Sequence, residues 1–396
     1  MGWGTSLAGP KSAWYGPTIP TARCSNRLEE CKRTMAKRKV LVAGASGLVG
    51  QAAVRHFAAQ PECEVFAVSR RVPDSIPCAK FLSVDLLDPR RCAEVFGQMG
   101  DVTHLVYAAV NEKPGLMDGW LDREQMQVNL TMLRNLFEPL EPAAKNLQHV
   151  SLLQGTKAYG AHLGPIAIPA RERSPRHAHQ NFYWLQEDYL RARQPGKRWS
   201  WTILRPQLVI GEAVGSNLNV IPAIGVYGAI RREAGLPLAY PGGARLVFEM
   251  VDVDLLARAM DWAANTPACR NEIFNITNGD VFTWDGVWPT IAESLGMKAG
   301  PPEPLALASE MPKQAAQWAA IVRKYRLRAP EDLQAFVGES FHLADFVFNT
   351  RSKTSGVTLV STIKARQAGF ADCIDTEDML RKWFRRFQEL RLLPPA

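Results

Sequence analysis

The chain has 396 residues, more than the usual single domain, so we expect two domains or one large domain with a grafted subdomain. Apolar residues make up 46% and charged residues 22% of the sequence, which is typical of ordinary globular proteins. The formal net charge is +8, but residues 1–40 account for most of it with eight basic and two acidic side chains. No basic stripe interleaved with aromatic residues follows, so nucleic-acid binding is not expected.

The first 37 residues predict a basic, disordered tail. They are rich in Ser, Thr, Gly and Pro and lack the apolar stretch of a secretory signal. Met35 directly precedes AKRKVLVAG and is a candidate for the true start of the protein. An organelle-targeting role for the tail is left open.

Cysteines and apolar runs bear on the compartment. The seven cysteines are odd in number and contain no C-x-x-C pair, so neither a disulfide framework nor a zinc site is expected. His177 and His179 lack further partners at ligand spacing, and no metal is predicted. The longest apolar run, 218–230, is shorter than the about 18 residues that span a bilayer and contains Pro222 and Gly225. We therefore expect a cytoplasmic protein that does not bind membranes.

From residue 38 onward, apolar strands alternate with helical segments. This alternation predicts an α/β fold with a Rossmann-type, doubly wound parallel sheet. Helices are expected at 48–59, 89–96 and 122–137. Strands are expected at 40–43, 64–68, 81–84, 104–108, 147–152 and 200–204.

The pattern changes after Gly211, where helical segments with Pro and Gly breaks dominate. A helix from about Asp252 and an apolar segment at 272–276 are predicted to return to the sheet. An amphipathic helix is expected at 377–390. The predicted organisation is a Rossmann core of 38–211, joined by 248–280, and a smaller, mostly helical substrate-binding subdomain of 212–247 and 281–396.

The segment VLVAGASGLVG carries a cofactor motif. Gly44, Gly47 and Gly50 form G-x-x-G-x-x-G directly after a predicted strand and open a predicted helix. Gly44 permits the tight turn, Gly47 lets the backbone approach a pyrophosphate, and Gly50 allows close helix–strand packing. The helix N-terminus attracts the phosphate charge.

The end of the second strand bears on which dinucleotide binds. Many NAD enzymes carry an acid there for the ribose hydroxyls, whereas this chain has Arg70 and Arg71, and Asp74 comes too late. Guanidinium groups bind a 2′-phosphate bidentately, so NADPH is the predicted cofactor. The alternative is a solvated Arg pair. Asp85, after the third strand, suits an adenine contact or a turn cap.

No Tyr is followed by Lys four residues later, so the Y-x-x-x-K pair of ordinary short-chain reductases is missing. Lys157 instead lies just past the carboxyl end of the fifth strand, at the edge where ligands bind in open α/β sheets. Tyr183 opens a predicted helix 26 residues later and could meet Lys157 there. A solvated Lys and a packing Tyr are the ordinary alternatives.

These two segments resemble the progesterone 5β-reductase and iridoid synthase family of enone reductases, which shows G-x-K-x-Y followed by N-F-Y-Y-x-x-E-D. The resemblance covers about residues 38–396 and is patchy after Gln317. Matching segments here are GTKAY at 155–159, NFYWLQED at 181–188, SRR at 69–71, DVTH at 101–104, LRP at 204–206 and FNITNGDVFTW at 274–284.

The resemblance implies hydride transfer from NADPH to the β-carbon of an α,β-unsaturated carbonyl. Tyr183 would donate a hydrogen bond to the developing enolate oxygen, and Lys157 would add positive field. The substrate would be a small apolar enone or enal. Further cofactor contacts are expected from Ser46, Leu48, Val49, Leu86, Ala109, Leu153, Tyr183, Val209, Ser216, Asn217 and Leu218.

Departures from the family pattern leave the substrate open. Trp184 replaces the second Tyr, Leu153-Gln154 replaces Gln-Thr, and Val110 stands where plant members carry a Trp that faces substrate. Ketone reduction, an epimerase or dehydratase activity, and a non-catalytic NADPH-sensing role remain alternatives. The sequence fixes neither product stereochemistry nor oligomeric state, and a homodimer is left open.

Overall fold

The computed structural model describes residues 38–70, 79–113, 118–216 and 218–396, so the predicted tail lies outside the described residues. The chain divides into two units, Met1–Met35 and Ala36–Ala396, and every described residue belongs to the second. Within the described ranges, none of the helices is both long enough and apolar enough to cross a bilayer.

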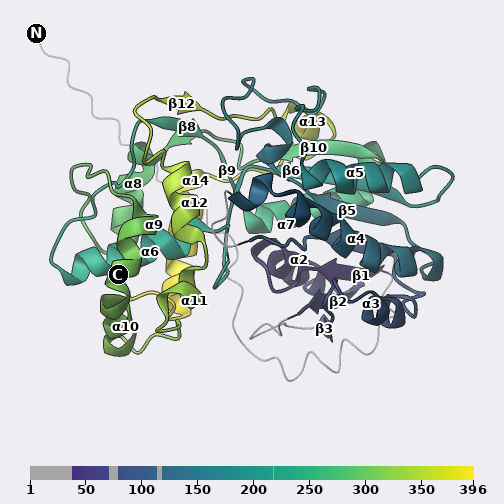
Figure 1. Ribbon diagram of the computed structural model, residues 1–396, viewed down its shortest axis with the longest axis horizontal. Helices are drawn as coiled ribbons and strands as arrows, with labels where there is room; N and C mark the ends of the chain where they lie inside the picture. The colour runs from purple at the N-terminus through teal and green to yellow at the C-terminus, as the bar shows by residue number, and fades with distance from the viewer. Residues whose placement is uncertain (1–37, 71–78, 114–117, 217) are drawn as a thin grey trace, which may run out of the picture. The chain divides into compact units, whose positions relative to one another are not determined.

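A seven-stranded parallel sheet is the centre of the fold (Figure 1). Its strands are β1 Arg38–Ala43, β2 Cys63–Ser69, β3 Ala79–Ser83, β4 His104–Tyr107, β5 His149–Leu153, β6 Ser200–Pro206 and β10 Glu272–Ile276. They lie in the order β10-β6-β5-β4-β1-β2-β3, and every neighbouring pair is parallel. The strand order reverses at β1, which places a ligand-binding crevice outside the carboxyl ends of β1 and β4.

Helices cover both faces of the sheet (Figure 1). On one face, α2 (Leu48–Ala58) packs against α7 (Val253–Asn265). On the other lie α3 (Pro89–Phe96), α4 (Arg123–Ala143) and α5 (Phe182–Arg193). Strand β1 explains why: Val40 and Val42 enter one apolar cluster, and Leu41 and Ala43 enter the other. A strand that is apolar on both faces needs a helical layer on each, and the predicted doubly wound Rossmann fold is confirmed.

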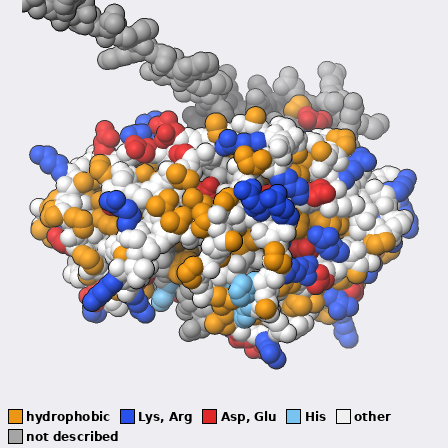
Figure 2. Space-filling model, turned by 90° about the horizontal axis from the view of Figure 1, so that it is seen from above, with side chains coloured by type: hydrophobic (Ala, Val, Ile, Leu, Met, Phe, Trp, Pro, Cys, Tyr) orange, Lys and Arg blue, Asp and Glu red, His pale blue; other side chains and the backbone are white. Residues whose placement is uncertain are grey.

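The C-terminal half is mostly helical. One apolar cluster holds most of its helices together, with Trp284, Trp318 and Phe384 among its fully or almost fully buried members, whereas Ala365 belongs to a cluster on the large sheet. Lys, Arg, Asp and Glu side chains are interspersed over the face seen in Figure 2. The helices are α6 Val220–Glu233, α8 Trp284–Ser294, α9 Leu307–Glu310, α10 Ala315–Lys324, α11 Leu333–Val337, α12 Ser340–Val347, α13 Ile363–Gln367 and α14 Thr376–Glu389.

Short strands and 3₁₀ turns complete the fold. β7 (Leu208–Ile210) pairs with β9 (Met250–Asp252), while β8 (Leu246–Phe248) lies between β11 (Phe282–Thr283) and β12 (Gly356–Val357). The 3₁₀ turns are η1 Asp118–Leu121, η2 Thr156–Tyr159, η3 Pro267–Cys269 and η4 Met311–Gln314.

Two helices differ from the sequence-based expectation. Helix α4 does not end at residue 137 but continues through Pro139 and Pro142, because Leu140 is fully buried and its packing outweighs the lost backbone bonds. Helix α6 is not broken at Pro222 or Gly225. Pro222 lies in the first turn, where its missing N–H would have no partner within the helix. At Gly225 a Cβ would lie 2.4 Å from Leu393 Cδ1, so the glycine permits close packing of the C-terminal end.

Asp252 fastens the C-terminal helix to the sheet half. Its side chain caps α7 by accepting the N–H groups of residues 254 and 255 at 2.8 and 3.0 Å. Its Oδ2 accepts hydrogen bonds from Lys382 Nζ and Trp383 Nε1, both at 2.9 Å, from α14. The Asp252 side chain is 1% exposed, so these bonds are shielded from water.

Asp252→Ala should lower the free energy of unfolding by at least about 2 kcal/mol, because it removes a helix cap and leaves the buried Trp383 N–H unpaired. Urea unfolding measures the loss. Asp372→Ala is the control, since it breaks an exposed pair with Arg258 and should cost less than about 1 kcal/mol. Equal losses in the two variants would show that Asp252 fastens nothing.

Candidate active site

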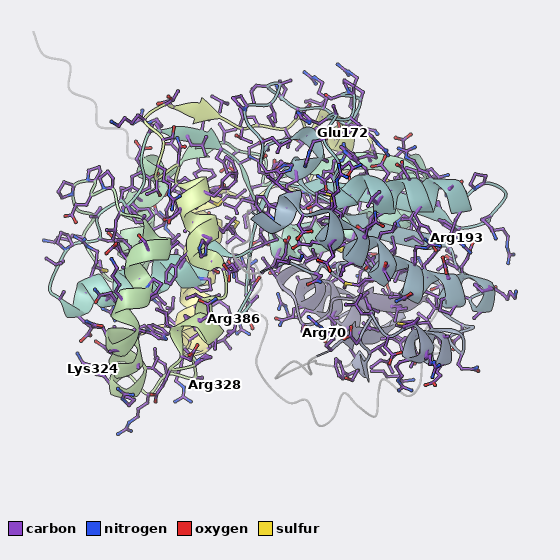
Figure 3. All side chains as sticks on the ribbon, in the orientation of Figure 1. Arg70, Glu172, Arg193, Lys324, Arg328 and Arg386 are labelled. Atoms are coloured by element: carbon purple, nitrogen blue, oxygen red, sulfur yellow. The ribbon has the colours of Figure 1, made fainter. Side chains whose placement is uncertain are left out.

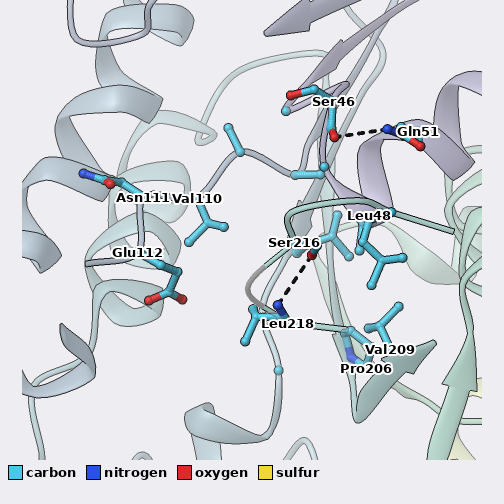
Figure 4. Close-up of a pocket in the computed structure, with 18 of the residues that line it drawn as sticks. Ser46, Leu48, Gln51, Val110, Asn111, Glu112, Pro206, Val209, Ser216 and Leu218 are labelled. Carbon is cyan, nitrogen blue, oxygen red and sulfur yellow. Dashed lines mark hydrogen bonds between the residues drawn. The ribbon is translucent and has the colours of Figure 1, made fainter. Parts of the chain in front are cut away.

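A cavity of about 740 Å³ opens at the carboxyl ends of the central strands. Its walls come from both halves of the chain, and Figure 4 shows Ser46 of the glycine-rich turn and Leu48 at the start of α2 together with Ser216 and Leu218. Nearly all predicted site residues line it together: Gly44, Ser46, Gly47, Leu48, Val49, Arg70, Asp85, Leu86, Ala109, Leu153, Lys157, Tyr183, Val209, Ser216 and Leu218. Their roles stay predictions, but their common location is a feature of the fold.

Three predicted residues stand apart. Gly50 lies inside α2 and does not line the cavity. A Cβ at Gly50 would lie 2.0 Å from the Gly44 carbonyl oxygen, so its part is close packing of the helix on the turn. Arg71 and Asn217 lie outside the described residues.

The glycine-rich turn leaves backbone room beside α2. Gly44 has φ +82°, and a Cβ there would lie 2.7 Å from the Ala109 nitrogen. Gly47 is the N-cap of α2 and supplies no side chain over the first N–H groups. These N–H groups therefore remain available to an anion that enters the cavity.

Arginines reach the cavity from two sides. Arg70 follows β2, and Arg328 lies between α10 and α11; Figure 3 labels both. Among the described residues, no carboxylate forms an ion pair with either guanidinium, whereas Glu212 in the cavity wall pairs with Arg386 at 2.9 Å. Asp85 accepts the N–H of Leu87 at 3.0 Å, so it caps a turn in addition to lining the cavity.

The turn after β5 places Lys157 beside Tyr183. Lys157 lies in η2, and a Cβ built at the preceding Gly155 would lie 3.4 Å from Tyr183 Oη. Asn181 joins the two segments: its Oδ1 accepts the Tyr183 N–H at 3.1 Å, and its Nδ2 donates to the Lys157 carbonyl at 3.0 Å. One amide therefore caps α5 and fixes the lysine turn against it.

A buried network holds α5 from behind. Gln154 Nε2 donates to the Tyr183 carbonyl at 3.2 Å and to Glu187 Oε2 at 3.1 Å. Arg205 Nε in turn donates to Gln154 Oε1 at 2.8 Å. Gln154, one of the departures from the family pattern, thus supports the tyrosine helix as well as lining the cavity.

Burial shifts the pKa values of Lys157 and Tyr183. The Lys157 side chain is 12% exposed, and burial lowers the pKa of its ammonium, against which the neighbouring Glu112 carboxylate raises it. Burial raises the pKa of Tyr183, and Glu112 raises it further, so the phenol stays protonated. Lys157 Nζ lies 4.2 Å from the Trp120 ring centre and 5.5 Å from those of Phe182 and Tyr183. The ammonium is thus surrounded by aromatic rings that favour a cation.

The sequence reasoning missed Glu112, Trp120, His162 and Arg328, which all line the cavity. Of these four residues, only Glu112 could have been predicted from the sequence, because it closely follows β4 at the edge of the sheet where ligands bind. Burial and the Lys157 charge lower the pKa of His162 to about 4, which makes it neutral near pH 7.

The sheet order, the glycine-rich turn and the cavity define a Rossmann-type fold with a crevice of the kind that holds a nicotinamide dinucleotide. A family model described as a PRISE-like Rossmann-fold domain matches residues 93–391, and the chain belongs to this family. The recognised resemblance is thereby confirmed.

Two curated relatives and one solved structure illustrate the likeness. The (S)-8-oxocitronellyl enol synthase of Antirrhinum majus is 30% identical over 89% of this chain and 92% of that protein. The 3-oxo-Delta(4,5)-steroid 5-beta-reductase of Arabidopsis thaliana is 27% identical over 97% of this chain and 100% of that protein. The UDP-glucose 4-epimerase of Thermotoga maritima shares the fold, with a TM-score of 0.62 and 17% identity over 89% of this chain and 99% of that one.

Gly50→Ala should weaken dinucleotide binding at least about tenfold, because the new methyl group would push the Gly44 turn out of place. Titration with NADPH and NADH measures the dissociation constants. Gly100→Ala is the matched control, since its Cβ meets only the Ala143 oxygen at 3.5 Å, an ordinary contact. Unchanged affinity in Gly50→Ala would contradict the close-packing role.

Proposed function

We propose that this protein is an NADPH-dependent enone reductase, which reduces the activated C=C bond of an α,β-unsaturated carbonyl. The observation that carries the proposal is the buried pairing of Tyr183 and Lys157, fixed by Asn181 at the edge of the cofactor cavity. The names of the enol synthase and steroid reductase relatives support the same class of reaction.

The residues present fit a dinucleotide phosphate. Gly44 and Gly50 leave no room for side chains where the turn meets α2, and the helix N-terminus faces the cavity. Arg70 lies at the end of β2, the position that selects between ribose hydroxyls and a 2′-phosphate. The guanidiniums of Arg70 and Arg328 add positive charge that favours the more anionic NADPH over NADH.

The reaction adds a hydride to the β-carbon and a proton to the α-carbon, and bound NADPH supplies the hydride. The protonated Tyr183 hydroxyl donates a hydrogen bond to the carbonyl oxygen, which gains negative charge as the enolate forms. The Lys157 ammonium strengthens this stabilisation through its field. Because Tyr183 and Lys157 are both engaged at the carbonyl oxygen, we assign the proton of the α-carbon to water.

The substrate end of the cavity favours an apolar molecule. Trp120, Phe182, Leu343, Phe346 and Val347 contribute to the wall. Val110 also points into the cavity, on the same wall as Glu112 (Figure 4). Its small side chain leaves room where a larger residue would narrow the wall, so the accepted enones should include branched or cyclic ones.

Tyr183→Phe should lower single-turnover hydride transfer to a plain cyclic enone about 100-fold or more, with NADPH affinity nearly kept, because one oxyanion donor is lost. Tyr189→Phe is the control: it removes a hydroxyl from the same helix, outside the cavity wall. The wild-type protein should consume NADPH with the enone and not with the matching saturated ketone. Wild-type rates in Tyr183→Phe would refute the proposal.

Arg70→Ala should raise the NADPH dissociation constant at least about tenfold and leave that of NADH nearly unchanged, because only NADPH carries the 2′-phosphate. Fluorescence titration with both cofactors gives the ratio. Arg91→Ala, which removes an exposed guanidinium paired with Glu94 on α3, should leave both constants alone. Equal weakening of NADPH and NADH by Arg70→Ala would contradict the assignment.

A further inference from the structure

Glu112 places a carboxylate against the candidate catalytic lysine. It follows β4, its side chain is 2% exposed, and it points into the cavity (Figure 4). Its Oε1 accepts a hydrogen bond from Lys157 Nζ at 3.4 Å. A carboxylate so far from water is retained only where a cation or strong donors compensate it.

Helix α4 holds Glu112 in this position. Gln125 Nε2 donates to Glu112 Oε2 at 2.9 Å, and Gln125 Oε1 accepts the N–H of Lys113 at 2.7 Å. Asn129 makes two hydrogen bonds to the backbone of Asn111, at 2.8 and 2.9 Å. The residues before and after Glu112 are thus both bonded to buried amides, which leaves the carboxylate little freedom to turn away from Lys157.

Within the described ranges, the other groups around Lys157 carry no negative charge. Trp120 of η1 and the Phe182 and Tyr183 rings of α5 face the ammonium, and His162 from the segment after η2 is neutral near pH 7. Among the described residues, Glu112 is the carboxylate that pairs with Lys157.

Two effects of Glu112 oppose each other. Its charge weakens the positive field of Lys157 at an enolate, but it also keeps the buried amine protonated. The second effect prevails for function, because a neutral amine would supply no positive field at all.

We propose that Glu112 is a positioning residue that keeps the Lys157 ammonium charged and directed at the reaction centre. The inference rests on the proposed Tyr183–Lys157 unit. It adds a third residue that acts through the lysine and does not touch the reacting atoms.

The test is the pH dependence of kcat/KM for an enone in Glu112→Gln. Removal of the carboxylate lowers the pKa of Lys157, and activity needs the protonated lysine, so the alkaline limb should move to lower pH by about 1–3 units. Glu112→Asp keeps the negative charge, so its alkaline limb should lie close to the pH of the wild-type limb. Glu124→Gln, which removes a 79% exposed carboxylate from the start of α4, should leave the limb in place. An unmoved limb in Glu112→Gln would overturn the inference.

A second measurement does not depend on chemistry. Lys157→Met leaves the Glu112 carboxylate buried without its cation, so it should lower the melting temperature of the cofactor-free protein. Adding Glu112→Gln to Lys157→Met should recover a large part of that loss, because the two effects are coupled. Additive losses would overturn the pairing. If Tyr183→Phe keeps wild-type rates while this coupling is present, the proposed function fails and the Glu112–Lys157 contact stands.

Discussion

The side-chain amide of Asn181 is the contact on which the site depends, because it fixes two segments that are separate in the chain. Its bonds to the Tyr183 N–H and the Lys157 carbonyl hold the lysine turn against the start of α5, and the remaining hydrogen bonds between the end of β5 and α5 come from Gln154. In ordinary short-chain reductases one helix carries both residues, so their distance is set by the helix itself. Here the distance is set by a hydrogen-bonded cap between two elements.

Further hydrogen bonds keep the two segments that Asn181 joins in place. Gln154 and Arg205, on neighbouring strands or their ends, hold α5 from the sheet side, and Asn129 and Gln125 hold the Glu112 segment from α4. Lys157, Glu112 and Tyr183 thus lie between Gln154 on the sheet side and the buried amides of α4. A buried network whose polar groups are all hydrogen-bonded fixes the positions of its side chains. It tolerates few substitutions, because a single unpaired buried group is costly.

Local patterns explain what the sequence predicted well. The glycine-rich turn, β1 and α2 are contiguous, and the strand is apolar on both faces, so their structure follows from a few adjacent residues. The prediction that Lys157 and Tyr183 lie close together rested on two short motifs at the ends of predicted elements. Glu112 and Arg328 were missed because their meaning depends on contacts across 45 residues or on the opposite wall of the cavity. The continuation of α4 past residue 137 was also missed, because packing of Leu140 outweighs two prolines.

The walls of the cavity have a consequence for how the protein holds together. They combine residues near the start of the sheet, such as Gly44, with residues near the end of the chain, such as Leu390 and Leu392. A ligand that contacts both walls would bind only when they are assembled, so its binding energy would add to the stability of the folded chain. At a hundred times the dissociation constant this linkage is worth about 2.7 kcal/mol, a sizeable share of the net stability of a typical domain. Such a ligand would thus act as a removable part of the core, and its concentration would influence how long the folded protein persists.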